Sequence, residues 1–92
     1  MKKNKNISIG DEVAFCTVNT IYLTSQSIKP NKLYLVIDKE YYMFPESEAL
    51  SHVKVVNEKG SGVWLDIVAG SALTKKELRK KFIDNILKEQ NQ

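Results

Sequence analysis

Apolar and polar residues alternate most clearly between positions 52 and 68, in two runs rich in β-branched residues. The runs are VKVV at 53–56 and VWLDIV at 63–68, and two glycines lie between them. A three-residue loop at 58–60 would place Gly60 where the backbone needs a positive φ, which a residue without a Cβ adopts at little cost. The pattern predicts a β-hairpin around which the rest of the chain is organised.

The register of this hairpin is constrained by which residues must share a face. With the loop at 58–60, Val53 lies opposite Leu65 toward the core, and Lys54 lies opposite Trp64 on the other face. With the loop one residue later, Lys54 lies opposite Asp66. Both registers keep the same residues on the same faces, because strand side chains alternate with a period of two. A two-residue loop would set Val53 against Asp66, so the pattern argues against it.

Two further strands are predicted upstream of the hairpin, at 12–18 and at 32–38. The second has apolar residues on both of its faces, as expected for a central strand. Between them, residues 24–31 contain Ser, Pro and Asn and predict a loop. Ile21 to Leu23 either extend the first strand or pair beside it.

The connection at 39–51 is longer than a tight turn requires and is rich in aromatic residues. Two interpretations remain open: a binding surface, since amphipathic rings are favoured at interfaces, or a loop that folds over an open end of the sheet as part of the core. Pro45 near its middle allows one helical turn over 45–50. The aromatic residues of this segment are Tyr41, Tyr42 and Phe44.

A C-terminal helix is predicted by local signals at its start. Thr74 and Glu77 form a capping box, and Leu73 with Leu78 forms a hydrophobic staple. The helix should run from Lys75 to about residue 89. At roughly 100° per residue its apolar side chains cover about half the circumference, so we expect it to pack on the sheet or against another molecule. This apolar stripe consists of Leu78, Phe82, Ile83, Ile86 and Leu87.

Some basic residues of this helix lie at positions that are unfavourable for helix stability, namely inside the apolar stripe and in the first turn. Arg79 points between Ile83 and Ile86, inside the apolar stripe. A lysine-rich first turn is also unfavourable to the helix dipole, which prefers anions there. Either the side chains overhang the body with their charged ends in water, or they point into a partner. The basic residues in question are Lys75, Lys76, Arg79, Lys80 and Lys81.

The length of 92 residues predicts one domain with a modest core, and the charge is unevenly distributed along it. Residues 1–5 carry three lysines, residues 6–73 carry five lysines against eight acidic residues, and residues 74–92 carry six basic against three acidic residues. Attraction to phosphate is therefore expected from the ends. No apolar run approaches the roughly 20 residues of a membrane span, and the single Cys16 suits a reducing cytosol.

No residue pattern indicates catalysis, a metal site or a cofactor. His52 is the only histidine and Cys16 the only cysteine, and nothing suggests that they meet as a nucleophilic pair. A cross-strand contact of His52 with Asp66 is the simpler interpretation. The glycines at 60–62 precede a strand and lack the spacing of a phosphate-binding loop. Trp64 could stack a base or a peptide proline, or cover the sheet under the C-terminal helix.

Three segments together resemble a known class of small proteins. They are GDEV at 10–13, KLYLVI at 32–37, and VKVVNEKG at 53–60 followed by VWL at 63–65. This arrangement resembles the SH3-like β-barrels of phage-encoded and bacterial accessory proteins. The resemblance implies a non-enzymatic binding module, and a phage origin would imply a regulator or inhibitor of a host protein.

The sequence therefore predicts a mainly β, α+β fold: a basic arm at 1–6, a small SH3-like antiparallel β-barrel at 7–70 with the insertion at 39–51, and an amphipathic helix at 74–90. We expect a cytoplasmic, non-catalytic protein without cofactors that binds a host protein or ribonucleoprotein. The alternative is an RNA-binding protein that contacts phosphates through the helix and the N-terminal lysines. A homo-oligomer through Leu78, Phe82 and Ile86 is a further possibility. The expected contact residues are Lys54, Trp64, Tyr41, Tyr42, Phe44, Lys75, Lys76, Arg79, Lys80 and Lys81.

Overall fold

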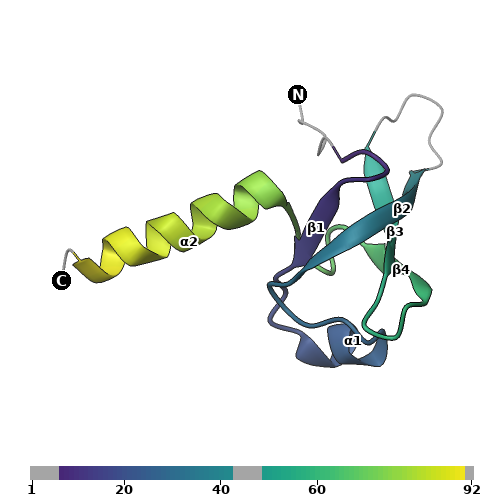
Figure 1. The fold of residues 1–92 in the computed structure, drawn as a ribbon, viewed down its shortest axis with the longest axis horizontal. Helices are drawn as coiled ribbons and strands as arrows, with labels where there is room; N and C mark the ends of the chain where they lie inside the picture. The colour runs from purple at the N-terminus through teal and green to yellow at the C-terminus, as the bar shows by residue number, and fades with distance from the viewer. Residues whose placement is uncertain (1–6, 43–48, 91–92) are drawn as a thin grey trace.

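The chain folds into one antiparallel sheet with a short helix at one end of it and a long helix that projects from it (Figure 1). The computed structural model describes residues 7–42 and 49–90, without the side chains of Asn85 and residues 87–90. The fold is of the α+β class. Its elements are β1 (Glu12–Phe15), α1 (Thr20–Ser25), β2 (Leu33–Tyr41), β3 (Leu50–Val56), β4 (Gly62–Asp66), β5 (Ala72–Thr74) and α2 (Lys75–Gln90).

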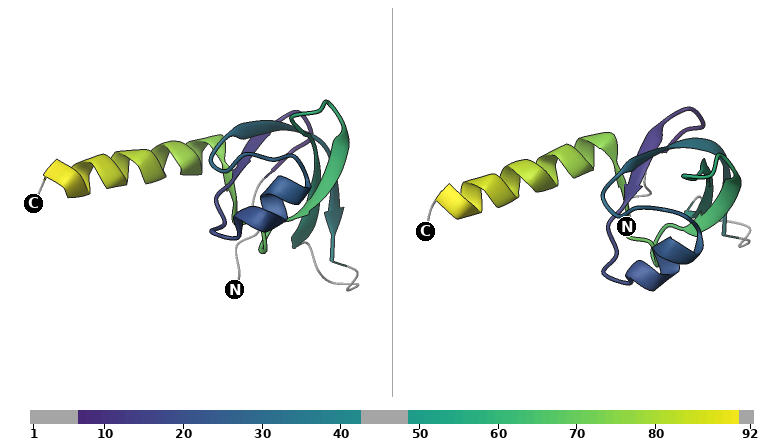
Figure 2. Two further views of the ribbon diagram at one scale, coloured as in Figure 1. Left: turned by 90° about the horizontal axis from the view of Figure 1, so that it is seen from below. Right: turned by 60° about the horizontal axis from the view of Figure 1, so that its bottom comes forward.

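The five strands lie in the order β4-β3-β2-β1-β5, and each neighbouring pair is antiparallel. The sheet curls strongly (Figure 2), yet within the described residues β4 and β5 remain its two edges and do not pair with each other. The sheet is therefore open, and the closed barrel expected from the sequence is not confirmed. The returning strand β5 has only three residues, all of which pair with β1.

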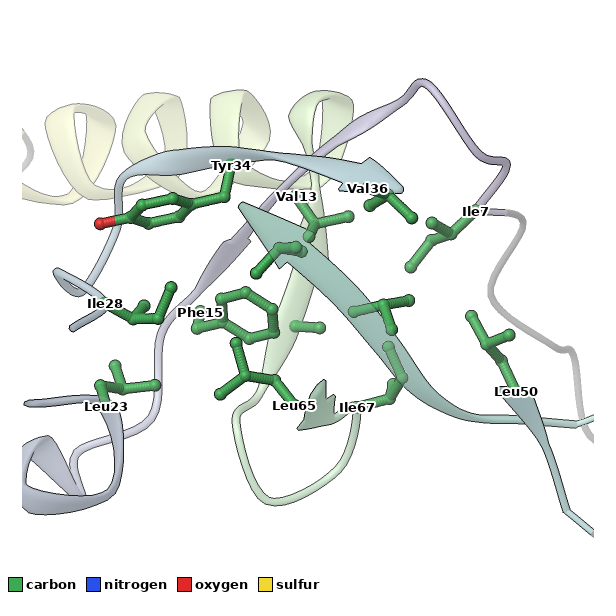
Figure 3. Packing of buried hydrophobic residues seen from close by; sticks show 13 residues of the cluster. Ile7, Val13, Phe15, Leu23, Ile28, Tyr34, Val36, Leu50, Leu65 and Ile67 are labelled. Carbon is green, nitrogen blue, oxygen red and sulfur yellow. The ribbon is translucent and has the colours of Figure 1, made fainter. Parts of the chain in front are cut away.

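The core fills the concave inner face of the sheet (Figure 3). Val13 and Phe15 alternate along β1 toward this face and are fully buried, as the alternation in sequence indicates. Leu23 of α1 and Ile28 lie under the sheet at one end and close it. The remaining members of the core cluster are Ile7, Tyr34, Val36, Leu50, Val53, Val55, Leu65, Ile67 and Ala72.

The central hairpin has the first of the two registers that the sequence allows. Val53 pairs with Leu65 and Lys54 pairs with Trp64. Gly60 has a φ of 79° and its N–H donates to the carbonyl of Asn57, which closes the three-residue loop at 58–60. The positive φ explains why glycine is suited to this position.

The short helix α1 was not expected from the sequence, which predicts a loop or strand there. It begins because the side chain of Asn19 accepts a hydrogen bond from the N–H of Tyr22 at 3.3 Å, a local cap. Leu23 is its only buried residue, so the sequence of α1 has no apolar stripe with helical spacing. The adjacent β-branched Ile21 favours a strand by propensity, and tertiary burial of Leu23 outweighs that preference.

Strand lengths also differ from the expected ones. β1 ends at Phe15 and not near residue 18, and β2 continues to Tyr41, because a register shift after Val36 lets it follow β3 further. Ala72 to Thr74 form β5, a short strand that the sequence does not predict. β4 ends at Asp66, whose carboxylate accepts the N–H groups of the two residues at 68–69 and turns the chain.

Tyr34 connects three segments through its hydroxyl. The ring is buried, and the hydroxyl donates to Glu58 Oε2 at 2.6 Å and accepts from the N–H of Lys29 at 2.7 Å. Burial, followed by the bond to Glu58, raises the pKa of Tyr34 to about 12. Lys32 Nζ lies 2.6 Å from the same carboxylate oxygen, and this contact and the Tyr34 bond lower the pKa of Glu58. The hairpin loop is thereby fixed to the segment before β2.

The long helix α2 starts directly after β5 and extends away from the sheet (Figures 1 and 2). Its predicted capping box is formed: Thr74 Oγ1 accepts from the N–H of Glu77 at 3.2 Å, and Glu77 Oε1 accepts from the N–H of Thr74 at 2.9 Å. Sixteen residues at about 1.5 Å each give a length of about 24 Å. Most of that length lies beyond the sheet.

Candidate interaction surfaces: helix α2 and the outer face of the sheet

Helix α2 is held by its first turn. Leu78 is only 6% exposed, and α2 contacts β1 and β5. Ala14, which lies between two inward-facing residues of β1, is also fully buried although it does not belong to the core cluster. Since Ala14 faces the outer side of the sheet, we infer that the first turn of α2 covers it there. Leu78 is therefore engaged within its own chain.

The rest of the apolar stripe is open to solvent. Phe82, Ile83 and Ile86 are 47%, 51% and 54% exposed. The expected packing of the helix on the sheet therefore applies to the first turn, and the three exposed residues form a narrow apolar patch along one side of the projecting part. Apolar residues grouped in this way commonly mark contact sites.

The basic residues in the first two turns of α2 are exposed, and among the described side chains only Lys75 of these has an ion-pair partner. Lys75 Nζ lies 3.9 Å from Glu12 Oε1. Among the side chains that the structure describes, no carboxylate lies within ion-pair distance of the other four basic residues predicted as contacts: Lys76, Arg79, Lys80 and Lys81. At about 100° per residue, Arg79 lies within the arc of the apolar stripe, whereas Lys80 and Lys81 lie outside it.

A second surface is the outer face of the sheet, on the side opposite the core. Lys54 and Trp64 point to this face, with Lys54 Nζ 5.9 Å from the centre of the Trp64 ring, and Trp64 is 40% exposed. The sequence allowed Trp64 to cover the sheet under α2. That is wrong, because α2 packs on β1 and β5, at the opposite edge of the sheet from β4.

The outer face has further exposed apolar residues on β2. Leu35 lies between two inward-facing residues and is paired with Glu12. Ile37 lies beside Lys54, since a Cβ built on Gly62 would meet side-chain atoms of both. Leu35 and Ile37 are both exposed, so the strand that the sequence predicts to be apolar on both faces is covered on one of them.

Acidic side chains surround these apolar residues. His52 lies between two of them: its Nδ1 is 3.6 Å from Glu40 Oε1 and its Nε2 is 3.7 Å from Asp66 Oδ2, which confirms the predicted contact with Asp66. Nδ1 is also 3.0 Å from Ser51 Oγ. Asp38 pairs with Lys54 and shares this face. The acidic residues of the outer face are Glu12, Asp38, Glu40 and Asp66.

The aromatic segment is described only in part. Tyr41 ends β2, and Lys39 Nζ lies 5.6 Å from the centre of its ring. Tyr42 follows, and both rings are exposed. Phe44, which was expected to be a contact residue, lies outside the described residues. So does most of the helical turn expected at 45–50, although Leu50 itself begins β3.

Cys16 lies just after β1 and is partly buried. Burial raises the pKa of the Cys16 thiol, and the nearby charge of Lys81 opposes this effect in part. A raised pKa keeps the sulfur protonated at neutral pH, which disfavours nucleophilic chemistry.

Sequence reasoning found the basic helix and the pair Lys54 and Trp64, and it missed the outer face as a whole. Leu35 and Ile37 read as core because an apolar strand usually indicates burial on both sides. The acidic residues are scattered over three strands, and only the observed strand order and register bring them together. Their excess in the middle of the chain was the available signal.

Within the described residues, no cluster of three or more His, Cys, Asp or Glu side chains has the geometry to hold a metal ion. The helices among those residues are too short or too polar to cross a membrane. Comparison of the chain with protein families, with curated protein sequences and with solved structures finds no match.

Proposed function

We propose that this protein is a non-catalytic binding module whose helix α2 docks into an apolar groove with an acidic rim on a partner protein. The observation that carries the proposal is the exposure of Phe82, Ile83 and Ile86 on a helix whose first turn, with the buried Leu78, packs on the sheet. Isolated helices of this length are marginal in water and gain most of their stability from packing. A partner groove supplies that packing, as in other helix-in-groove complexes.

The distribution of charge favours a protein groove over a phosphate backbone. The exposed apolar residues occupy an arc of about 100°, whereas the basic residues are spread around most of the helix. Arg79 lies between apolar neighbours, where phosphate contact would leave Ile83 and Ile86 in water. In a groove, the apolar arc is buried and the basic side chains around it face acidic groups at the rim.

Burial of this arc would make a substantial contribution to the affinity for a partner. Full burial of such a side chain contributes about 1.5–3 kcal/mol, so the exposed half of each contributes about 1 kcal/mol. Three residues give about 3 kcal/mol, which is about a hundredfold in affinity. In our proposal the protein regulates or inhibits its partner, a host protein or ribonucleoprotein, as its resemblance to phage-type SH3-like modules implies.

Capture of partners from a bacterial lysate tests this proposal. Tagged parent, Phe82→Asp and Ile21→Asp chains are compared with and without nuclease, with Ile21 as the control because it is exposed on α1, remote from α2. We expect a protein that the parent and Ile21→Asp retain after nuclease and that Phe82→Asp loses at least tenfold.

The competing RNA function gives a different result. It requires that capture disappear with nuclease, fall steeply with salt, and depend on Lys76, Arg79, Lys80 and Lys81 but not on Phe82. That result would overturn the proposal in favour of phosphate binding.

A further inference from the structure

The outer face of the sheet and the exposed part of α2 are complementary in charge. The outer face has exposed Leu35, Ile37 and Trp64 among the carboxylates of Glu12, Asp38, Glu40 and Asp66, with Lys54 as its basic residue. Helix α2 has exposed apolar residues among basic ones. Each surface therefore has the composition that the other requires in a partner.

The two surfaces are also continuous within one chain. The first turn of α2 packs over Ala14 on the outer side of β1, and Lys75 of that turn lies 3.9 Å from Glu12. The helix then leaves the sheet at the β5 edge (Figure 1), so it does not cover its own Ile37 or Trp64.

From this complementarity we propose that a second copy of the chain occupies the outer face. The two copies exchange helices: α2 of each lies on the outer face of the other, with its apolar stripe against Leu35, Ile37 and Trp64. The arrangement has twofold symmetry, so both contacts are identical and the assembly closes as a dimer.

The size of the contact explains why the exchange must be reciprocal. The part of α2 beyond Leu78 is about 18 Å long and about 10 Å wide, so it covers roughly 180 Å² of sheet, and this area is lost on both partners. One such contact removes roughly 360 Å² and two remove roughly 700 Å², so only the reciprocal exchange reaches the size of a weak, transient interface. We expect a dimer that dissociates at micromolar to millimolar concentration.

This inference uses the same apolar stripe of α2 as the proposed function, but the two can be told apart because the dimer also needs the outer face of the sheet. Ile37→Glu should abolish self-association and leave capture of a partner by α2 intact. Phe82→Asp should abolish both. A chain that does not dimerise can therefore still bind a partner through α2, and a chain that captures no partner can still dimerise.

Sedimentation velocity of the full chain from about 1 μM to about 1 mM, a range that covers weak dimers, tests the dimer. We expect Ile37→Glu and Phe82→Asp each to reduce association at least tenfold. Ile21→Glu, the same change at an exposed residue of α1, should not reduce it. Circular dichroism confirms that each variant is folded.

A mixture of the Ile37→Glu and Phe82→Asp chains provides the decisive comparison. One contact survives in the mixed pair, so the mixture should associate more strongly than either variant alone and less strongly than the parent. Charge reversal on the outer face by Asp38→Lys and Glu40→Lys alters no buried residue and should also weaken the dimer. Added salt should weaken the parent dimer.

Three results would overturn the inference. A monomer at every concentration excludes self-association, and oligomers that keep growing exclude a closed pair. A dimer that tolerates Ile37→Glu but not Phe82→Asp would show that the helices pair with each other and not with the sheet.

Discussion

Replacing Tyr34 with phenylalanine removes one oxygen atom and separates three parts of the fold. The hydroxyl links β2 to Glu58 in the hairpin loop and to the backbone of Lys29. The ring itself remains in the core, so the change tests the hydrogen bonds with little effect on packing. The structure predicts that the difference in stability between the parent and the variant is largest near neutral pH and shrinks at alkaline pH.

At pH 7 the variant should be less stable by about 2 kcal/mol. Loss of the hydroxyl leaves the partly buried N–H of Lys29 without its acceptor, which costs about 1–3 kcal/mol. The carboxylate of Glu58 keeps its contact with Lys32 Nζ at 2.6 Å, so its charge stays compensated. The loss of about 2 kcal/mol therefore comes from the unpaired N–H of Lys29 and from the lost charge-assisted hydrogen bond between Tyr34 and Glu58.

At alkaline pH the difference should shrink. The pKa of Tyr34 is raised to about 12, against an ordinary value of 10 in the unfolded chain. Between these values the unfolded chain has released the proton and the folded chain keeps it, so the free energy of unfolding falls as pH rises. The parent therefore loses, between about pH 10 and pH 12, part of the stability that the hydroxyl gives at neutral pH. Tyr34→Phe lacks this loss.

Urea unfolding followed by the fluorescence of Trp64 measures both effects, at several values between pH 7 and pH 12. We expect the parent curve to fall toward the Tyr34→Phe curve between about pH 10 and pH 12. Tyr41→Phe, a matched change on an exposed ring, should stay within about 0.5 kcal/mol of the parent at pH 7. Parallel curves for the parent and Tyr34→Phe across the alkaline range would refute the assigned role of the hydroxyl.

Three further changes test the packing and the turns. Leu78→Ala should loosen α2 and lower stability by about 2–3 kcal/mol, seen as faster amide exchange at the start of the helix; unchanged exchange would contradict its anchoring role. Gly70→Ala should cost about 2 kcal/mol or more in urea unfolding, because its Cβ would lie 2.8 Å from Phe15 Cδ1; a neutral result would contradict that close approach. Gly60→Ala has open space around it but a φ of 79°, so it should cost only about 1 kcal/mol, and a larger loss would point to contacts not seen here.

The sequence predicted features that depend on neighbouring residues. The hairpin register followed from alternation along two strands joined by three residues, and the cap of α2 followed from Thr74 and Glu77. Helix α1 was missed because Asn19 is its only local signal and a single buried side chain, Leu23, gives no periodicity.

The features that the sequence did not predict depend on distant parts of the chain. The apolar stripe of α2 does not reveal that the helix projects from the sheet. The same pattern, with Phe82 and Ile86, is expected whether the helix packs on the sheet or on another molecule. The open sheet depends on β5 pairing with β1 and not with β4. The acidic outer face depends on the strand order, which no local pattern specifies.

Thr74 belongs to two elements, since it pairs with Val13 at the end of β5 and caps the first turn of α2. The strand pairing therefore sets the direction in which the helix points. Over about 24 Å, a tilt of about 10° at this junction would move the far end by about 4 Å, nearly one helical turn. The direction of α2 therefore depends on a few backbone hydrogen bonds at the sheet edge. Substitutions around residue 74 would change this direction while leaving the residues of the helix itself unchanged.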